Sequence, residues 1–398
     1  MKSKISLILF LMAAVGSVNA QIPAKVLFHA KEQTKLMLKE LENFKAKQPN
    51  SNLVSPRTLV NGDLKMVPSK DWTSGFFPGE LWYLYSLTGE ENWKTAAESF
   101  TAPIEQEKTN STTHDMGFKV YCSFGTGYRI TKDQHYKEVI IQAAKTLATR
   151  FNPKVGAIRS WDHHEEQWKF PVIIDNMMNL ELLFEATKLS GDSIYYKIAV
   201  AHANTTMKNH FRADYSTYHV IGYDPETGKV LQKQTHQGYS DASSWARGQG
   251  WALYGYTMCY RETGDVKYLH QAENVAKFIF NNPHMPKDLV SYWDFDAPQI
   301  PNEPKDVSAA TLMASALYEL STYSNKKKDY LSKANTIIKN VFNHYRSGMG
   351  ANHGFILSHS TGSKPANSEV DVPISYADYY YLEALSRMKN IKNHQFLY

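Results

Sequence analysis

A short phrase recurs along the chain and restricts the folds that are open to it. In four copies a Thr or Ser is followed by a flexible residue, an acid and, three positions later, an aromatic residue. These copies are Thr88-Gly89-Glu90 with Trp93, Thr131-Lys132-Asp133 with Tyr136, Ser190-Gly191-Asp192 with Tyr195, and Thr263-Gly264-Asp265 with Tyr268. Because a glycine-like residue ends one helix and an acid caps the next, the phrase predicts a repeated helical hairpin.

The spacing of the copies shows how much chain each repeat holds. A looser fifth copy, Tyr323-Ser324-Asn325 with Tyr330, extends the series. Successive copies lie roughly 45 to 75 residues apart, which is longer than the usual period of a helical solenoid. Each repeat must therefore contain a helix pair and a long loop, and loops of that length often carry function.

Apolar residues at the i, i+3, i+4 and i+7 positions predict about twelve helices. The segments are approximately 24–47, 73–88, 91–109, 114–130, 133–150, 175–190, 193–211, 242–263, 266–281, 306–323, 328–345 and 374–388. Twelve helices in antiparallel hairpins can close into a toroid of six inner and six outer helices. We therefore expect an all-α fold of the (α/α)6-barrel type; an open solenoid is the alternative, but it would show more regular periods.

Alternation typical of strands is brief. It occurs only around 217–222 and 229–234, on either side of the turn Asp224-Pro225-Glu226-Thr227-Gly228. We therefore expect one small β-hairpin in an otherwise helical chain.

The first twenty residues have the features of a secretory signal peptide. Basic Met1-Lys2-Ser3-Lys4 precedes an apolar stretch at 5–14, and Val18-Asn19-Ala20 suits cleavage after Ala20. No Cys follows that site to carry a lipid anchor, and no other apolar run is long enough to span a bilayer. With no linker-like segment in the remainder, we expect residues 21–398 to form a single, soluble catalytic domain that is exported to the periplasm.

Composition narrows the classes of function. The net charge of +5 is spread along the chain without the Lys/Arg-rich block typical of nucleic-acid binding. Aromatic residues make up 13% and crowd the segments between helices, where sugar rings could stack on them. The two cysteines, Cys122 and Cys259, lie in apolar helical patterns and are compatible with either a disulfide or two buried thiols.

The helices that do not begin at a repeated junction would form the inner ring. They begin near 72–79, 114–118, 175–179, 243–251, 306–310 and 375–381, and these starts are rich in acids, Ser, Gly and aromatic residues. Since the starts of the inner helices meet at one end of such a barrel, that rim is the candidate site.

Asp115 and Asp175 begin two of these inner helices at corresponding places, next to His114 and to Asn176 and Asn179. Across the mouth of a barrel they could face each other, and two close carboxylates leave one protonated and the other ionised. The alternative is that each is an ordinary helix N-cap.

Further candidates cluster in one stretch. Arg247 and Trp251 are four residues apart on a helix, so a guanidinium could hold a carboxylate beside an indole, with Gln237 nearby. Alternatively, Arg247 pairs with an internal acid such as Asp241. Trp72, Trp161 and His219 could be core residues or, together, a sugar-binding wall.

The chain shows no pattern typical of a metal or a nucleotide cofactor, and we expect neither. His163-His164-Glu165-Glu166 lacks the HExxH spacing that puts two ligands on one helical face, and it reads as an exposed loop. Gly125-Thr126-Gly127 falls within a predicted helix and not in a phosphate-binding loop.

Several ordered motifs resemble those of the unsaturated glucuronyl hydrolases of glycoside hydrolase family 88. They are Trp72-Thr73-Ser74-Gly75-Phe76, His114-Asp115-Met116-Gly117-Phe118, Ile174-Asp175-Asn176-Met177-Met178-Asn179-Leu180, Trp245-Ala246-Arg247-Gly248-Gln249 and Tyr376-Ala377-Asp378-Tyr379. The resemblance implies an (α/α)6 barrel that removes the non-reducing-end 4,5-unsaturated uronic acid from lyase-generated oligosaccharides. The implied partner is an anionic oligosaccharide, and a monomer or weak homodimer is expected.

The resemblance also implies roles for individual residues. Asp175 would protonate C4 of the vinyl ether and then, as a carboxylate, activate the water that adds at C5. Asp115 would bind sugar hydroxyls and help to keep Asp175 protonated, while Arg247 and Gln237 would hold the unsaturated sugar. The surrounding substrate-binding wall would comprise Trp72, His114, Trp161, His219 and Trp251.

Substrate choice is less defined by the sequence. Some members bind sulfate through a Ser-x-x-Ser-x-Lys pattern, and Ser360, Ser363 and Lys364 resemble it with the Lys one residue early. A flexible Ser/Gly loop is the alternative interpretation. Rival functions are an unsaturated rhamnogalacturonyl hydrolase acting on pectin fragments, a non-catalytic glycan-binding protein, and an ordinary two-carboxylate glycosidase.

Overall fold

The computed structural model describes residues 22–393, and its main helices follow the predicted segments closely. They are α1 (Ala24–Lys47), α2 (Phe76–Thr88), α3 (Glu91–Thr101), α4 (Thr126–Thr131), α5 (Gln134–Ala148), α6 (Leu180–Ser190), α7 (Ser193–Asn209), α8 (Ala246–Thr263), α9 (Val266–Asn281), α10 (Val307–Leu320), α11 (Lys327–Asn340) and α12 (Ser375–Lys392). The predicted signal peptide, residues 1–20, lies outside the described residues and stays a prediction.

Shorter helical pieces extend several of these helices. Two π-helical segments, Gly117–Gly125 before α4 and Val341–Tyr345 after α11, continue their neighbours, and 3-10 turns occur at Ala102–Thr109, Ile174–Asn179 and Asn352–Gly354. Gly125-Thr126-Gly127 lies within the helix formed by Gly117–Gly125 and α4, as predicted.

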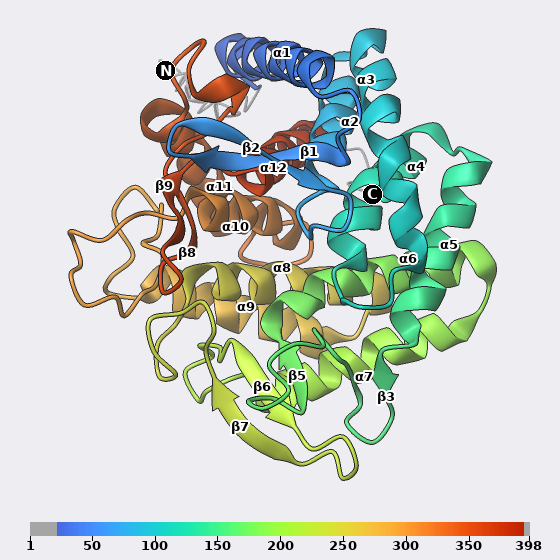
Figure 1. The fold of residues 1–398 in the computed structure, drawn as a ribbon. Helices are drawn as coiled ribbons and strands as arrows, with labels where there is room; N and C mark the ends of the chain where they lie inside the picture. Colours follow the sequence, from blue (N-terminus) through green and yellow to red (C-terminus); the bar gives the residue numbers. More distant parts are fainter. Residues whose placement is uncertain (1–21, 394–398) are drawn as a thin grey trace, which may run out of the picture.

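The inner helices form a closed ring. Around it, α2 contacts Gly117–Gly125 and α4, that segment contacts α6, and contacts continue through α8, α10 and α12 back to α2. The outer helices α3, α5, α7, α9 and α11 each pack on an inner one, and Thr34 of α1 bonds to Glu80 of α2. The predicted (α/α)6 barrel is confirmed, and Figure 1 shows the helices wrapped around the central α8, α10 and α12.

Burial separates the two rings. Every residue of α10 is buried, which is expected of a helix enclosed on all sides. The outer helix α9 instead buries a single stripe that includes Tyr268, Ala272, Val275 and Ile279. The repeated junctions therefore mark outer helices, whose one apolar face packs inward.

The recurring phrase forms the same hydrogen bonds at each junction. Gly89, Lys132, Gly191 and Gly264 take the left-handed conformation, with φ of 71°, 58°, 76° and 68°. The hydroxyl before each one donates to the carbonyl four residues earlier and accepts the N–H of the acid two residues later. The Thr or Ser of the phrase thus closes one helix and holds the start of the next.

The acids of the junctions are not equivalent. Asp133, Asp192 and Asp265 accept backbone N–H groups of the following helix, as an N-cap should. Glu90 forms no such cap and accepts the indole N–H of Trp93 instead, at 3.1 Å. Three of the four predicted caps are therefore confirmed, and the longer Glu side chain is used for an aromatic contact.

The β content is larger than the single hairpin that we expected. The predicted hairpin is present as β6 (Val220–Tyr223) and β7 (Val230–Gln234), extended by β5 (Phe170–Ile173) in an antiparallel sheet of order β5-β6-β7. Three further pairs are β1 (Leu53–Val60) with β2 (Asp63–Pro68), β3 (Phe151–Asn152) with β4 (Ala157–Ile158), and β8 (Ser360–Ser363) with β9 (Ser368–Val372).

The missed hairpins lie in the long loops that precede inner helices. Asn61 and Gly62, with φ of 53° and 88°, form the tight turn between β1 and β2, and Asn-Gly is a strong hairpin signal that could have been recognised. β1 contacts α12 and β9, and β8 contacts α10. These strands therefore stand beside the rim formed by the starts of the inner helices (Figure 1).

Buried charges join the inner helices toward the C-terminal ends of α8, α10 and α12. Arg261 of α8 bonds to Glu181 of α6 at 2.5 Å and to Glu319 of α10 at 2.8 Å. Arg387 of α12 lies 3.2 Å from Glu319, and Arg129 of α4 lies 3.6 Å from Glu181. The network therefore connects five of the six inner helices.

The remaining inner helix joins through Glu383 of α12. One oxygen of its carboxylate accepts the hydroxyl groups of Tyr83 of α2, at 2.8 Å, and Tyr254 of α8, at 3.0 Å, while the other accepts Ser315 of α10 at 2.6 Å. All six inner helices thus contribute to one buried polar network.

Removing one cap tests the interpretation of the junctions. Asp192→Ala deletes the acceptor of the Ile194 N–H, so we expect the free energy of unfolding in urea to fall by about 1 kcal/mol. Asp192→Asn keeps an acceptor and should lose a few tenths at most. Equal losses for both variants would show that the cap hydrogen bond contributes nothing there.

Candidate active site

A cavity of about 170 Å³ opens among the starts of the inner helices. Eight of the residues chosen from the sequence line it together: Trp72, His114, Asp115, Trp161, Asp175, Gln237, Arg247 and Ser363. Arg57, Phe118, Ile173, Gly362, Ser368, Glu369 and Tyr376 complete the lining. The rim at the helix starts is therefore where the predicted residues converge.

Asp115 is held by the segment that leads into its helix. Thr113 Oγ1 donates to Asp115 Oδ2 at 2.6 Å, and His114 Nε2 lies 3.2 Å from Oδ1. Thr113 pairs with Trp161 in an isolated antiparallel bridge, and the His114 N–H donates to the carbonyl of Ser160. This strand-like pairing fixes the carboxylate at the cavity wall.

Asp175 lies in the 3-10 turn Ile174–Asn179 that leads into α6, and only 8% of the residue is exposed. Its Oδ2 is buried without a hydrogen-bond partner, and the nearest ring nitrogen is His219 Nε2 at 3.5 Å. Among the described residues, neither Asp175 nor Asp115 accepts a backbone N–H of the helix that follows. The N-cap interpretation of these two acids is therefore wrong.

Asn179 joins the two acid-bearing segments. Its Oδ1 accepts the N–H groups of Gly117, at 2.8 Å, and Phe118, at 3.3 Å. Gly117 and Phe118 follow Asp115 closely in the sequence, and Asn179 itself lies one helical turn after Asp175. A Cβ on Gly117 would lie 2.7 Å from Asn179 Cα, so only glycine allows this approach. Asn179 is thus a structural bridge between the acids and not a ligand of the cavity.

Arg247 has a different partner from the one suggested by the sequence. Its Nη1 lies 2.5 Å from Asp306 Oδ2 and donates to the carbonyl of Thr361, and its Nη2 donates to the carbonyl of Gly362. Arg247 therefore does pair with an internal acid, but this acid is Asp306 and not Asp241, which accepts the N–H of Thr235. The guanidinium holds strand β8 at the cavity wall with its charge balanced by Asp306.

The expected Arg247–Trp251 pair does not line the cavity as a unit. Trp251 is fully buried and packs on Phe118 and Tyr380, with ring centroids 5.2 and 5.6 Å apart. The indole next to Arg247 is Trp245, at 4.6 Å. The i, i+4 spacing places Arg247 and Trp251 on the same helix, but it does not determine which aromatic ring packs against the guanidinium.

Three predicted wall residues occupy distinct positions. Trp72 packs on Phe118 and Tyr376 at the cavity, with centroids 5.4 and 5.0 Å away. Trp161 stacks on His163 at 5.2 Å, with an 18° angle between the rings. His219 does not line the cavity, but it contacts two residues that do, Asp175 and Gln237.

Arg57 is a cavity residue that the sequence analysis missed. From β1 it donates Nε and Nη2 to the carboxylate of Glu369 on β9, at 2.6 and 3.0 Å, and Nη1 to Asp71 at 2.8 Å. Gln237 Nε2 donates to the Gly362 carbonyl at 3.2 Å, on the same β8–β9 side. The β1–β2 turn signal could have indicated that Arg57 belongs near the rim.

The three residues of the possible sulfate pattern do not lie together at the cavity. Ser363 lines it, whereas Ser360 is fully buried in β8 and Lys364 is not among the lining residues. Ser368 and Glu369 occupy the neighbouring positions on β9. One of the three predicted residues therefore faces the cavity, next to a carboxylate.

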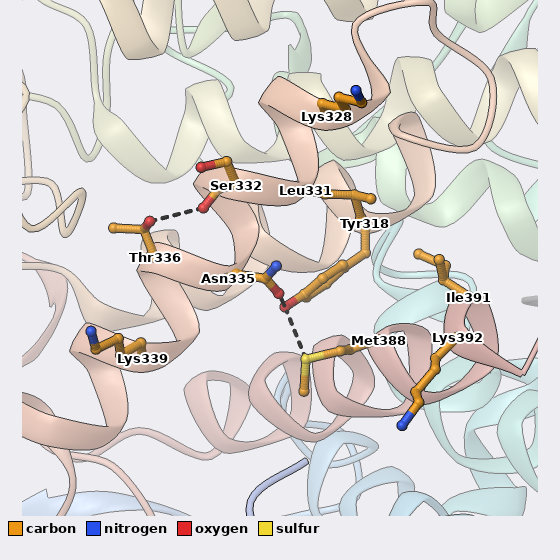
Figure 2. A pocket seen from close by; sticks show the side chains of 10 residues that line it. All are labelled: Tyr318, Lys328, Leu331, Ser332, Asn335, Thr336, Lys339, Met388, Ile391 and Lys392. Atoms are coloured by element: carbon orange, nitrogen blue, oxygen red, sulfur yellow. Dashed lines mark hydrogen bonds between the residues drawn. The ribbon is translucent and has the colours of Figure 1, made fainter. Parts of the chain in front are cut away.

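Other features of the described residues fall outside this cavity. A hollow of about 570 Å³ beside α10, α11 and α12 is lined by Lys328, Lys339 and Lys392 and by no carboxylate (Figure 2). No group of His, Cys, Asp and Glu among residues 22–393 could hold a metal ion, and none of the helices there has the length and apolar character for a bilayer crossing. Cys122 and Cys259 are buried free thiols, and burial raises the pKa of both.

Comparison with known proteins identifies the family of the chain. The family model for Glycosyl Hydrolase Family 88 matches residues 47–397. The chain belongs to this family. It is therefore a glycoside hydrolase, and the family resemblance expected from the motifs is confirmed.

Named relatives cover most of the chain. The unsaturated glucuronyl hydrolase of Formosa agariphila is 54% identical over 343 residues, 86% of either chain. The unsaturated chondroitin disaccharide hydrolase of Streptococcus agalactiae is 32% identical over 340 residues, 84% of this chain and 85% of that one. A crystal structure of an unsaturated glucuronyl hydrolase specific for heparin is 46% identical with a TM-score of 0.87, covering 92% of this chain and 98% of the other.

A substitution at Gly117 tests the contact between the two acid-bearing segments. Gly117→Ala places a methyl group against Asn179 Cα, so we expect the free energy of unfolding to fall by about 1–3 kcal/mol. Gly348→Ala is the matched control, because a Cβ there meets nothing closer than 3.7 Å. Indistinguishable urea unfolding curves for the two variants would rule out the tight approach.

Proposed function

We propose that this glycoside hydrolase removes the 4,5-unsaturated uronic acid from the non-reducing end of lyase-generated, glycosaminoglycan-type oligosaccharides. The observation that carries the proposal is Asp175, a carboxyl group at the cavity that forms no ion pair with a Lys or Arg of residues 22–393 and caps no helix there. A cavity of about 170 Å³ is smaller than pockets for drug-sized ligands, which suits a terminal sugar and not an internal stretch of polymer. The names of the relatives support the same substrate class.

The reaction begins at the alkene and not at the anomeric carbon. Protonated Asp175 donates its proton to C4, and positive charge develops as an oxocarbenium ion shared by C5 and the ring oxygen. Water then adds at C5 while the Asp175 carboxylate takes up one of its protons, so one residue serves as acid and then as base. The resulting hemiketal opens, and the glycosidic bond is lost.

The other cavity residues hold the sugar for this step. Asp115, fixed by Thr113 and His114, accepts hydrogen bonds from sugar hydroxyl groups. Trp72 and Trp161 offer aromatic surfaces to the ring. Gln237 and Arg247 both donate to the Gly362 carbonyl, and they orient the sugar carboxylate on that side of the cavity.

Asp175→Asn tests the chemical role. The amide cannot donate and retrieve the proton, so we expect turnover of an unsaturated chondroitin disaccharide to fall by about 100- to 10,000-fold. The assay follows loss of the ultraviolet absorbance of the conjugated alkene, and circular dichroism checks the fold. Asp192→Asn makes the same chemical change at an outer junction and should retain full activity.

Two outcomes would contradict this mechanism. Retained turnover in Asp175→Asn would remove the residue from its role. Release of sugar with the alkene absorbance intact would instead indicate an ordinary two-carboxylate glycosidase. A protein that binds the disaccharide without consuming it would support a non-catalytic function, and turnover confined to unsaturated pectin fragments would indicate the rhamnogalacturonyl hydrolase.

Glu369 gives an expectation about sulfated substrates. Its carboxylate is held by Arg57 at the wall that also carries Ser363 and Ser368, so a sulfate there would compete with Glu369 for the guanidinium. We expect Glu369→Gln to raise the rate on a sulfated disaccharide relative to the unsulfated one by about tenfold, an order-of-magnitude figure for removing one competing charge. Lys364→Ala, outside the cavity lining, should leave the ratio unchanged; a falling ratio would restore the sulfate role of Lys364.

A further inference from the structure

His219 is fixed next to Asp175 by backbone pairing. It immediately precedes β6, whose first residue, Val220, pairs with Ile173 at the end of β5. The Ile174 N–H donates to the His219 carbonyl at 3.1 Å, one residue before Asp175. Only 3% of His219 is exposed, and its ring packs on Trp245 with centroids 4.6 Å apart. The imidazole therefore has little freedom to turn.

The hydrogen bonds of the ring determine its tautomer. Nδ1 accepts two backbone N–H groups, those of His236 and Gln237, each at 3.1 Å. An atom that accepts two donors must present its lone pair, and a neutral imidazole carries its single proton on the other nitrogen. The proton of His219 is therefore on Nε2.

The other ring nitrogen lies near a carboxylate oxygen that is also without a hydrogen bond. Nε2 lies 3.5 Å from Asp175 Oδ2, and neither atom has a hydrogen-bond partner among the described residues. The separation is slightly long for a hydrogen bond, and it can shorten when charge appears on the carboxylate. The arrangement places a fixed N–H donor close to the buried oxygen of Asp175.

We infer that His219 is a positioning residue for Asp175. Its neutral imidazole is held as the Nε2–H tautomer by the backbone of residues 236 and 237. The Nε2–H group directs the proton of Asp175 to the other carboxyl oxygen, and it stabilises the carboxylate that forms when C4 is protonated. The inference rests on the proposed function and assigns to His219 a role different from a sugar-binding wall. A donor fixed before the reaction acts without reorganisation when charge develops.

The surroundings of His219 favour the neutral ring. A second proton on Nδ1 would face the two N–H groups that now donate to it. The nearby imidazoles add no positive charge at neutral pH, because burial lowers the pKa of His236 to about 4 and that of His210 to about 3. A charged imidazolium would instead hold Asp175 as a carboxylate and remove the acid that the reaction needs.

Kinetics can separate a positioning role from a sugar-binding one. His219→Met keeps most of the volume without a donor, so we expect kcat to fall about 100-fold with KM changed less than threefold. His219→Gln can direct an amide N–H to Asp175 and should recover at least tenfold of that loss. A rise in KM with kcat unchanged in both variants would overturn the inference and return His219 to the sugar-binding wall.

Nuclear magnetic resonance tests the tautomer without relying on activity. In the full-length protein labelled with 15N-histidine, we expect His219 at pH 7 to show a protonated Nε2 and an unprotonated Nδ1, assigned by the signals lost in His219→Gln. A protonated Nδ1, alone or in an imidazolium, would overturn the inference whatever the two variants do in the kinetic assay. Because this readout uses no substrate, a wild-type protein that fails to consume the unsaturated disaccharide would defeat the proposed function and leave the tautomer result standing.

Discussion

Three arginines and three glutamates meet inside the inner ring, where each charge is tolerated only because its partners are present. Arg129, Arg261 and Arg387 balance Glu181, Glu319 and Glu383, and Tyr83 brings the remaining helix into the network. Removing one member of a buried pair leaves an uncompensated charge, which costs far more than the pair contributes when intact. The network therefore penalises any arrangement in which one helix is missing or shifted, and it fixes the helix starts at the other end.

The cavity lies at the starts of these fixed helices, and short hydrogen bonds position the acids there. Asn179 ties the segment of Asp115 to the turn of Asp175, and Thr113 and His114 hold the Asp115 carboxylate. The β-hairpins supply the rest of the wall through Arg247, which anchors β8. The acids therefore depend on rigid helix starts for their position, while the hairpins shape what can approach them.

Local patterns in the sequence were sufficient to predict the barrel and many of the residues at its rim. Helical periodicity and the repeated junction depend on neighbours a few residues apart, so the helices, their caps and the convergence of Asp115 with Asp175 could be predicted. The partners of the arginines could not. Arg57 and Glu369 are 312 residues apart, and Arg247 pairs with Asp306 rather than with the nearer Asp241, because tertiary packing selects between acids that look equivalent in the sequence.

The contacts that close the ring also order events during synthesis. Helix α12 packs against α2, and Glu369 of β9 pairs with Arg57 of β1. The two segments that close the ring are therefore synthesised about 300 residues apart. At translation speeds of about 5–20 residues per second, the N-terminal segment that contains β1 and α2 lacks its contacts with β9 and α12 for tens of seconds. The cavity is therefore complete only after Glu369 and Tyr376 at its wall have been synthesised, and a fragment that ends before α12 leaves the α12-facing side of α2 uncovered.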